Sequence, residues 1–236
     1  MAEISIATSP SLVSSTFSDT VTTSSFSAAA ETLLVATVIG VNLGGGAPSV
    51  SGGSLSWPRR VQRSFEGVYA EIWTAPCANG ATGITVTASL SDAFTLALKV
   101  DVVTGADLSA PVGQTGTGST TTNNATITGY TSSKAGSRGF CAAAEINNLG
   151  VPTSTDDESA FASTISGMAV RKASNTASAG NTVTFNLDAA GSSSADWQWA
   201  AAEILPGSID ATKNLATVDA EADVHNVSVS AGHKFT

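Results

Sequence analysis

The stretch Ile84-Thr85-Val86-Thr87-Ala88-Ser89-Leu90 alternates aliphatic and hydroxyl-bearing side chains without interruption. Because successive side chains of a β-strand point to opposite faces of a sheet, the stretch predicts a strand with one buried and one polar face. Residues 182–187, Thr-Val-Thr-Phe-Asn-Leu, repeat the arrangement, and Val227-Ser228-Val229 repeats it in short form. This alternation indicates sheets that pack on a core through one face.

Three other segments, 33–41, 94–103 and 197–205, are almost continuously apolar. Runs of this kind suit the central strands of a sandwich, although periodicity alone does not distinguish them from buried helices. Turn signals such as Asn79-Gly80 and Gly180-Asn181 separate the segments, and glycine supplies the positive φ angles that tight hairpin turns need. The best helical candidate is residues 156–165, where acidic side chains suit a helix N-terminus.

With so little helical signal, the sequence predicts an all-β fold: a two-sheet antiparallel β-sandwich, jelly-roll-like, with extended N- and C-terminal arms. We predict an N-terminal Ser/Thr-rich arm or first strands over residues 1–30, with Phe17 and Phe26 as isolated anchors. The β-sandwich domain is expected over residues 31–206, and a C-terminal arm with a short strand over residues 207–236.

The composition limits the classes of partner. Only 12% of the 236 residues are charged, and the formal net charge is −9. Nucleic-acid-binding proteins concentrate Lys and Arg to displace counterions, so we expect no nucleic-acid partner. The N-terminus has no basic start followed by an apolar stretch, and the apolar segment 33–41 is far shorter than the roughly 20 residues of a membrane span. We therefore expect no signal peptide and no membrane insertion.

The residues that most often bind metals or act as nucleophiles are few. Cys77 and Cys141 allow one disulfide and fit no zinc motif, and a buried free thiol is the simpler interpretation. His225 and His233 lie in the terminal segment, which argues against a hydrolase triad. The triplet Asp156-Asp157-Glu158 offers oxygen ligands for Ca²⁺ without EF-hand spacing, so a solvated loop is favoured. The sequence predicts no metal and no cofactor.

Three glutamates, Glu71, Glu145 and Glu203, each occur in the tripeptide Ala-Glu-Ile within an expected strand. Paired carboxylates perform glycoside hydrolysis, so these residues are the best enzymatic candidates. Each also fits a solvated position in a mostly apolar strand, and we expect no enzyme. We interpret the repeated tripeptide as similar sheet environments and not as a duplicated domain.

One group of residues combines aromatic and cationic side chains: Trp57, Arg59, Arg60 and Tyr69. Exposed Trp and Tyr stack on sugar rings or anchor protein partners, so these four are candidate partner or glycan contacts. Packing in a core or hairpin is the alternative. The basic pair Arg171-Lys172 is interpreted as solvated surface charge.

A series of strand and turn segments resembles the β-sandwich modules in structural proteins of tailed bacteriophages, of the minor tail and head-decoration type. The resemblance covers roughly residues 30–206 and is carried by Ala70-Glu71-Ile72-Trp73-Thr74-Ala75-Pro76, the strands at 83–90 and 98–105, Gly105-Ala106-Asp107-Leu108-Ser109-Ala110-Pro111-Val112, and Trp197-Gln198-Trp199-Ala200-Ala201-Ala202-Glu203-Ile204-Leu205-Pro206. Related modules occur in bacterial surface proteins, where carbohydrate contact is often supposed.

The resemblance implies a non-enzymatic structural protein of a tailed-phage virion, exposed on the head or tail exterior and held by inter-subunit contacts of its arms. The expected partners are other copies of the chain, most simply in a trimer, and capsid or tail proteins, with a host surface glycan as a further candidate. The expected location is the virion, after synthesis in the host cytoplasm. The alternative is a carbohydrate-binding module for bacterial envelope glycans, and a glycoside hydrolase ranks below it.

Overall fold

The computed structural model describes residues 2–42, 44, 46–147, 150–163, 165–188 and 195–208. Every regular element in these ranges is a β-strand, and every pairing between named strands is antiparallel. The prediction of an all-β antiparallel sandwich is confirmed. The C-terminal arm beyond residue 208, with its short strand at 227–229 and both histidines, lies outside the described residues.

Two inner sheets form the middle of the molecule. The first inner sheet has the order β1-β11-β5-β8-β7, with β2 also paired to β11. Its strands are β1 (Ser5–Ala7), β2 (Val13–Thr16), β5 (Thr32–Asn42), β7 (Arg59–Phe65), β8 (Val68–Cys77) and β11 (Ala93–Thr104). The second inner sheet has the order β12-β18-β14-β16-β15. Its strands are β12 (Val112–Thr120), β14 (Arg138–Glu145), β15 (Asp157–Ala162), β16 (Ser166–Arg171) and β18 (Trp197–Ile204).

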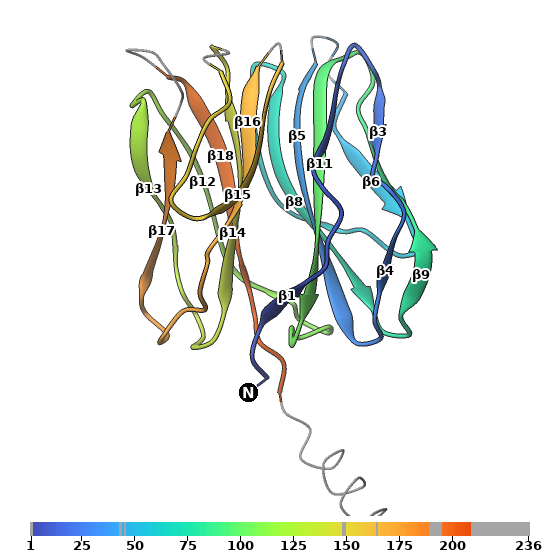
Figure 1. The fold of residues 1–236 in the computed structure, drawn as a ribbon. Coiled ribbons are helices and arrows are strands. Elements are labelled where there is room, and N and C mark those ends of the chain that lie inside the picture. Colours follow the sequence, from blue (N-terminus) through green and yellow to red (C-terminus); the bar gives the residue numbers. More distant parts are fainter. Residues whose placement is uncertain are drawn as a thin grey trace, which may run out of the picture.

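Smaller outer sheets cover the far face of each inner sheet. Beside the first inner sheet lie β3 (Thr20–Thr22), β10 (Val86–Ser89) and β6 (Ser49–Gly52), together with β4 (Phe26–Ala28) and β9 (Ala81–Ile84). Beside the second lie β13 (Asn124–Thr131) and β17 (Thr182–Asp188). The four layers are visible from left to right in Figure 1. The structure thus extends the expected pair of sheets by one further layer on each side.

Three hydrophobic cores separate the four layers, and they explain the two kinds of apolar pattern. In β5, Leu33, Val35 and Ile39 pack in the central core between the inner sheets, whereas Leu34 and Val38 pack in the core under the first outer layer. A strand that is buried on both faces needs apolar side chains at consecutive positions. The continuous runs therefore belong to the inner sheets, while the alternating stretches form outer strands with one solvated face.

The strand order of the first inner sheet is repeated in the second. Each inner sheet with its outer layer makes up one half of the molecule. In each half the chain first forms an edge strand, an outer strand and a central strand. It then forms a hairpin beside the central strand, a second outer strand, and a strand on the central strand's other side. Thus β5, β8, β7 and β11 correspond to β14, β16, β15 and β18, and the β3–β10 and β4–β9 pairs correspond to β13–β17. The bridge between Thr153 and Asp188 corresponds to the pairing of β6 with β10.

The Ala-Glu-Ile repeats do not follow this duplication of topology. They lie in or at the end of β8, β14 and β18, and the counterparts of these strands are β16, β5 and β11. Glu71, Glu145 and Glu203 are all fully buried, so the interpretation of solvated positions is wrong, but the repeat does mark similar environments within the inner sheets.

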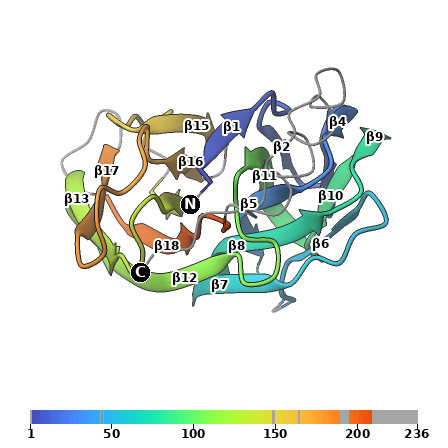
Figure 2. The ribbon, with the colours of Figure 1, turned by 90° about the horizontal axis from the view of Figure 1, so that it is seen from below.

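The two inner sheets also meet along two seams, which Figure 2 shows from below. At one seam β7 lies beside β12 and β18. At the other, β15 lies beside the N-terminal segment, where a hydrogen bond joins the hydroxyls of Thr16 and Ser163. Residues 2–30, expected as an arm or first strands, form the four short strands β1 to β4 on the first half.

Of two local expectations, the helix is wrong and the buried free thiols are confirmed. The helical candidate at 156–165 is wrong, because residues 157–162 form β15, an edge strand paired along its length with β16. Cys77 and Cys141 are both buried and free. They lie in the two separate outer cores with both inner sheets between them, so no disulfide joins them.

The central core depends on small side chains that let the inner sheets approach closely. Ala142, Ala144, Ala200 and Ala202 of the second inner sheet are fully buried against the first. We predict that Ala200→Leu overpacks this core and lowers the free energy of unfolding by about 1–3 kcal/mol, measured as a lower urea midpoint. The control is Ala110→Leu at an exposed position. Equal midpoints for the two variants would contradict the close approach of the sheets.

Candidate functional site

The aromatic members of the predicted contact group are packed side chains. Trp57 is 7% exposed, and its indole N–H donates to the carbonyl of Gly52 at 3.0 Å. Tyr69 is 6% exposed in the same outer core. Both rings therefore present little surface on which a sugar could stack.

The two arginines of this group lie at the start of β7 and bind side chains of β8. The guanidinium of Arg59 forms an ion pair with Glu71 at 3.0 Å and lies over the ring of Trp73, 5.6 Å from its centroid. Arg60 Nε donates to Thr74 Oγ1 at 2.7 Å, and burial lowers the pKa of Arg60. The structure brings the four predicted residues to one region of the first half, where Arg59 is the most exposed member.

The carboxylate of Glu71 is held in an apolar environment by two donors. Arg59 Nη1 donates to Oε1, and Trp73 Nε1 donates to Oε2 at 2.8 Å. Burial raises the pKa of Glu71 from 4.5 to about 7, although the hydrogen bond from Trp73 and the charge of Arg59 act in the opposite direction. Glu71 is therefore a group that changes protonation state near neutral pH.

Glu203 is buried in a different way, because the backbone supplies its donors. The N–H groups of Gln114 and Ser133 donate to its carboxylate at 2.9 Å, and the hydroxyl of Ser133 donates at 2.6 Å. Burial alone would raise the pKa of Glu203, but these hydrogen bonds together lower it below its ordinary value. Glu145 accepts from the N–H groups of Asn147 and Asp196. Both side chains thus fasten loops to the second inner sheet.

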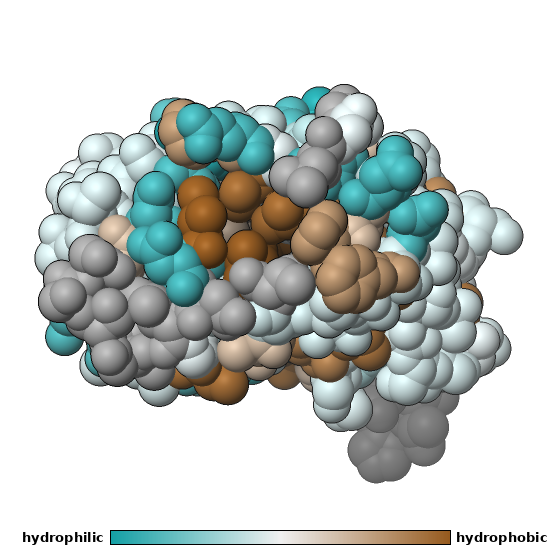
Figure 3. Space-filling view, turned by 90° about the horizontal axis from the view of Figure 1, so that it is seen from above, coloured by the Kyte–Doolittle hydropathy of each residue, from teal (hydrophilic) through white to brown (hydrophobic). Residues whose placement is uncertain are grey.

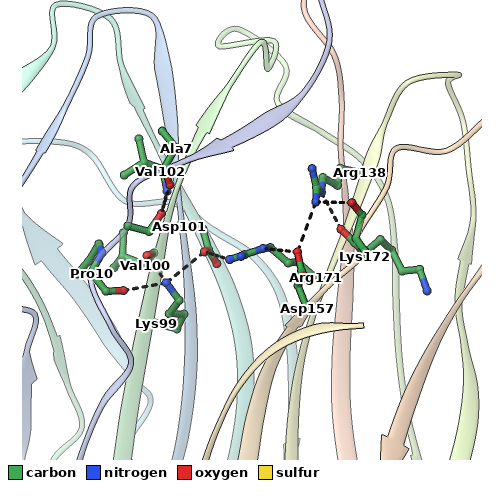
Figure 4. A network of polar contacts seen from close by, with 12 residues as sticks. Ala7, Pro10, Lys99, Val100, Asp101, Val102, Arg138, Asp157, Arg171 and Lys172 are labelled. Atoms are coloured by element: carbon green, nitrogen blue, oxygen red, sulfur yellow. Dashed lines mark hydrogen bonds and ion pairs between the residues drawn. The ribbon is translucent and has the colours of Figure 1, made fainter. Parts of the chain in front are cut away.

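A network of charged side chains crosses between the inner sheets near the N-terminal segment (Figure 4). Asp101 on β11, whose side chain is 4% exposed, pairs with Lys99 at 3.2 Å and with Arg171 of β16 at 2.5 Å. Lys99 Nζ also donates to the carbonyls of Pro10 and Val100. These contacts connect the two inner sheets and the N-terminal segment at one point.

The network continues on the second inner sheet. Asp157 of β15 pairs with Arg171 at 3.3 Å and with Arg138 at 3.7 Å. Beside it, Lys172 and Asp156 pair at 2.6 Å. The expectation of solvated charges is therefore wrong for Arg171, Lys172 and Asp156, whose side chains are 26%, 26% and 8% exposed. Asp157, at 45%, remains partly solvated. The basic residues Arg171 and Lys172 form ion pairs with acidic residues of β15 and the segment before it, which are distant in sequence but close in space.

An open cavity of about 300 Å³ lies over this network. Its wall is the N-terminal segment, with Lys99, Ser159 and Arg171 from the strands beneath, and its lining consists of Ile6, Ala7, Ser9, Pro10, Ser11, Leu12, Lys99, Ser159 and Arg171. The described residues contain no cluster of three or more His, Cys, Asp or Glu side chains that could hold a metal ion.

The large exposed hydrophobic side chains of the described residues gather at one end of the molecule. We call Phe17, Phe65, Phe94 and Val151 the apolar end; they are 71%, 39%, 36% and 55% exposed. Phe17 and Phe94 lie at the paired ends of β2 and β11, and Phe65 lies where β7 turns into β8. Figure 3 shows this end from above, with a hydrophobic hollow in its centre.

Phe17 is exposed although its position is costly. Its φ is 56°, a left-handed conformation that costs a residue with a Cβ roughly 1–2 kcal/mol. Its ring meets that of Phe94 edge to face, with the centroids 5.0 Å apart. Of the two isolated anchors expected from the sequence, Phe17 is therefore exposed, whereas Phe26 packs against the core under the first outer layer.

Acidic side chains surround the apolar end. Asp19 accepts a hydrogen bond from the N–H of Ala93, Asp92 lies in the turn before β11, and Glu66 lies in the turn before β8. All three are exposed. The sequence alone did not reveal this surface, because its members are far apart in the chain and only the strand register brings them together.

The comparisons with known proteins give no relatives: no protein-family model, no curated protein and no solved structure matches this chain. Among the described residues, no helix is long and apolar enough to span a membrane.

The buried glutamates predict two opposite pH effects on stability. Between pH 4.5 and 7 the unfolded chain ionises Glu71, whereas the folded chain keeps the proton, so stability falls as the pH rises. The full loss is about 3 kcal/mol. Glu203, with its lowered pKa, instead contributes stability above its ordinary pKa that is lost as the pH falls through the folded value.

We therefore expect Glu71→Gln to remove a decline in stability between pH 4.5 and 7, and Glu203→Gln to remove a decline at lower pH. Urea unfolding across this pH range measures both, with each variant serving as the control for the other. If the two variants give the same pH profile, the assignment of opposite shifts is incorrect.

Proposed function

We propose that this chain is a non-enzymatic structural protein that attaches to a larger assembly through its apolar end. The observation that carries the proposal is the gathering of the exposed large hydrophobic side chains at that end. Soluble proteins rarely expose a contiguous apolar patch without using it for contact. At the opposite end the N–H of Ala2 donates to the carbonyl of Gly207, and the chain leaves the described part there (Figure 1).

The partner that fits this end has an apolar centre and a basic rim. Asp19, Asp92 and Glu66 surround the patch, and the cation beside it, Arg63, already lies over the ring of Phe65 at 5.7 Å. Two identical copies meeting through this end would bring their acidic rims together, which is unfavourable. We therefore propose docking to a different protein.

In its specific form the proposal is a virion protein of a tailed phage, on the head or tail exterior, with capsid or tail proteins as the docking partners. The resemblance to phage sandwich modules supports it: the segments that carry it contribute β8, β11 and β18 of the inner sheets and β9 and β10 of the outer layer, and residues 105–111 connect β11 to β12. The engagement of Glu71, Glu145 and Glu203 in internal hydrogen bonds supports a non-enzymatic role.

One observation favours carbohydrate binding as a second candidate function. A cleft of about 410 Å³ beside β12 and β13 is lined largely by hydroxyl groups and includes Trp199. Trp199 is 8% exposed, about as buried as Trp57, so its ring presents little surface for stacking. A glycan would bind this cleft through hydrogen bonds to its hydroxyl groups.

Particle association tests the proposed function. In lysates of cells that carry the gene and produce phage, we expect the tagged chain to band with particles in a density gradient. The double variant Phe17→Ser/Phe94→Ser should remain in the soluble fractions at normal stability, because both side chains are exposed.

The matched control is Thr117→Ser on the exposed edge strand β12, which should band as the wild type does. A wild-type chain that never bands with particles would remove the virion proposal, and a double variant that bands normally would remove the role of the apolar end.

Removal of the arm beyond Ser208 tests the expected self-assembly. A chain that ends at Ser208 keeps every described contact. We expect the full chain to sediment as a trimer and the shortened chain as a monomer, measured by sedimentation velocity. Equal sedimentation of both chains would show that the arm does not hold subunits together.

A further inference from the structure

The cavity over the inter-sheet network has a lining with two cations and no acidic residue. Lys99 and Arg171 are its charged members, and the others are apolar or carry hydroxyl groups. The side chains of Lys99 and Arg171 are 7% and 26% exposed, so both charges are largely shielded from water. Electrostatic attraction is stronger in such an environment than on an open surface.

The network beneath the cavity holds one more cation than carboxylate. Lys99, Arg138 and Arg171 face Asp101 and Asp157, and Asp157 is the most exposed of the five, at 45%. The neighbouring pair of Lys172 and Asp156 is neutral. Burial, and after it repulsion from Arg171, lowers the pKa of Arg138, whereas Asp157 and Asp101 act in the opposite direction.

Hydrogen-bond donors for an additional anion remain at the cavity. The three N–H donors of Lys99 are directed to Pro10, Val100 and Asp101, so Lys99 would attract an anion in the cavity by its charge alone. Arg171 uses Nε for Asp157 and Nη1 for Asp101, and no described residue accepts a hydrogen bond from its Nη2. Ser159, on β15, adds a hydroxyl to the same lining.

We propose that this cavity binds a small oxyanion, a carboxylate or a phosphate group, against the guanidinium of Arg171. Nη2 of Arg171 supplies the N–H donors, and hydrogen bonds from a guanidinium to a carboxylate or phosphate oxygen are strengthened by the opposite charges. A volume of about 300 Å³ holds the anion and a short carbon skeleton, which Ile6 and Leu12 can cover. The inference is independent of the virion proposal.

Calorimetric titration of the full chain at pH 7 and low ionic strength tests the site. Sodium phosphate and sodium acetate are the two probes, each with sodium chloride of equal ionic strength as the reference. We expect at least one probe to bind with a dissociation constant of about 1 mM or tighter. The probe that binds more tightly identifies phosphate or carboxylate as the preferred group.

Two variants locate the binding. Arg171→Gln should weaken it about tenfold or more, because a hydrogen bond to a charged group is lost. Ser159→Leu should abolish binding by filling the cavity while every ion pair of the network stays in place. If Arg171→Gln fails to fold, Ser159→Leu alone decides the question.

The matched control comes from the other seam. Arg63 of β7 donates from Nε to Gln198 Oε1 at 2.7 Å and is a half-buried arginine between the inner sheets, as Arg171 is. Arg63→Gln should bind the probe as the wild type does. The absence of chloride-corrected heat for both probes would overturn the proposal. Undiminished binding by Ser159→Leu would also overturn it, because the anion would then bind elsewhere.

Discussion

Burying both faces of the two inner sheets removes water from almost every side chain of their central strands, so each polar group there needs a partner within the protein. The ion pair of Asp101 with Arg171 meets this need across the central core, at 2.5 Å between the two sheets. Removing one member of a buried pair leaves an uncompensated charge that costs about 3–5 kcal/mol. The position of the two halves relative to each other is therefore fixed by electrostatics as well as by apolar packing.

The same constraint determines where the molecule can act. The outer strands show hydroxyl side chains to water, as Thr22 and Thr87 do where they hydrogen-bond across β3 and β10. The interior is closed by the three cores, and the buried carboxylates of Glu71 and Glu203 have their donors already. Three surfaces differ from the rest: the apolar end with its exposed hydrophobic side chains, the hydroxyl-lined cleft, and the cationic cavity over Arg171. The proposed contacts are at these surfaces.

The sequence predicted the class of fold because strand periodicity is a local property. It predicted two sheets and not four layers, although its two apolar patterns mark the layers in the structure: the continuous run at 33–41 is β5, buried on both faces, and the alternating run at 182–187 is the outer strand β17. The site was harder to predict. Trp57 and Tyr69 looked like contact residues and are packed, whereas Phe17 looked like an anchor and is exposed. Exposure depends on which strands pair, and residues such as Asp101 and Arg171 are brought together by packing between sheets that no local pattern records.

The two seams between the inner sheets are equivalent in topology and different in chemistry. At the β7–β18 seam Arg63 donates a hydrogen bond to the neutral Gln198. At the opposite seam three cations meet two carboxylates around Asp101. The first seam thus holds a cation without a carboxylate, so the fold itself does not require an ionic cluster, and buried ion pairs seldom stabilise a protein more than neutral packing does. The second seam differs because a cavity lies beside its cations Lys99 and Arg171, and this space is what would let an anion reach them.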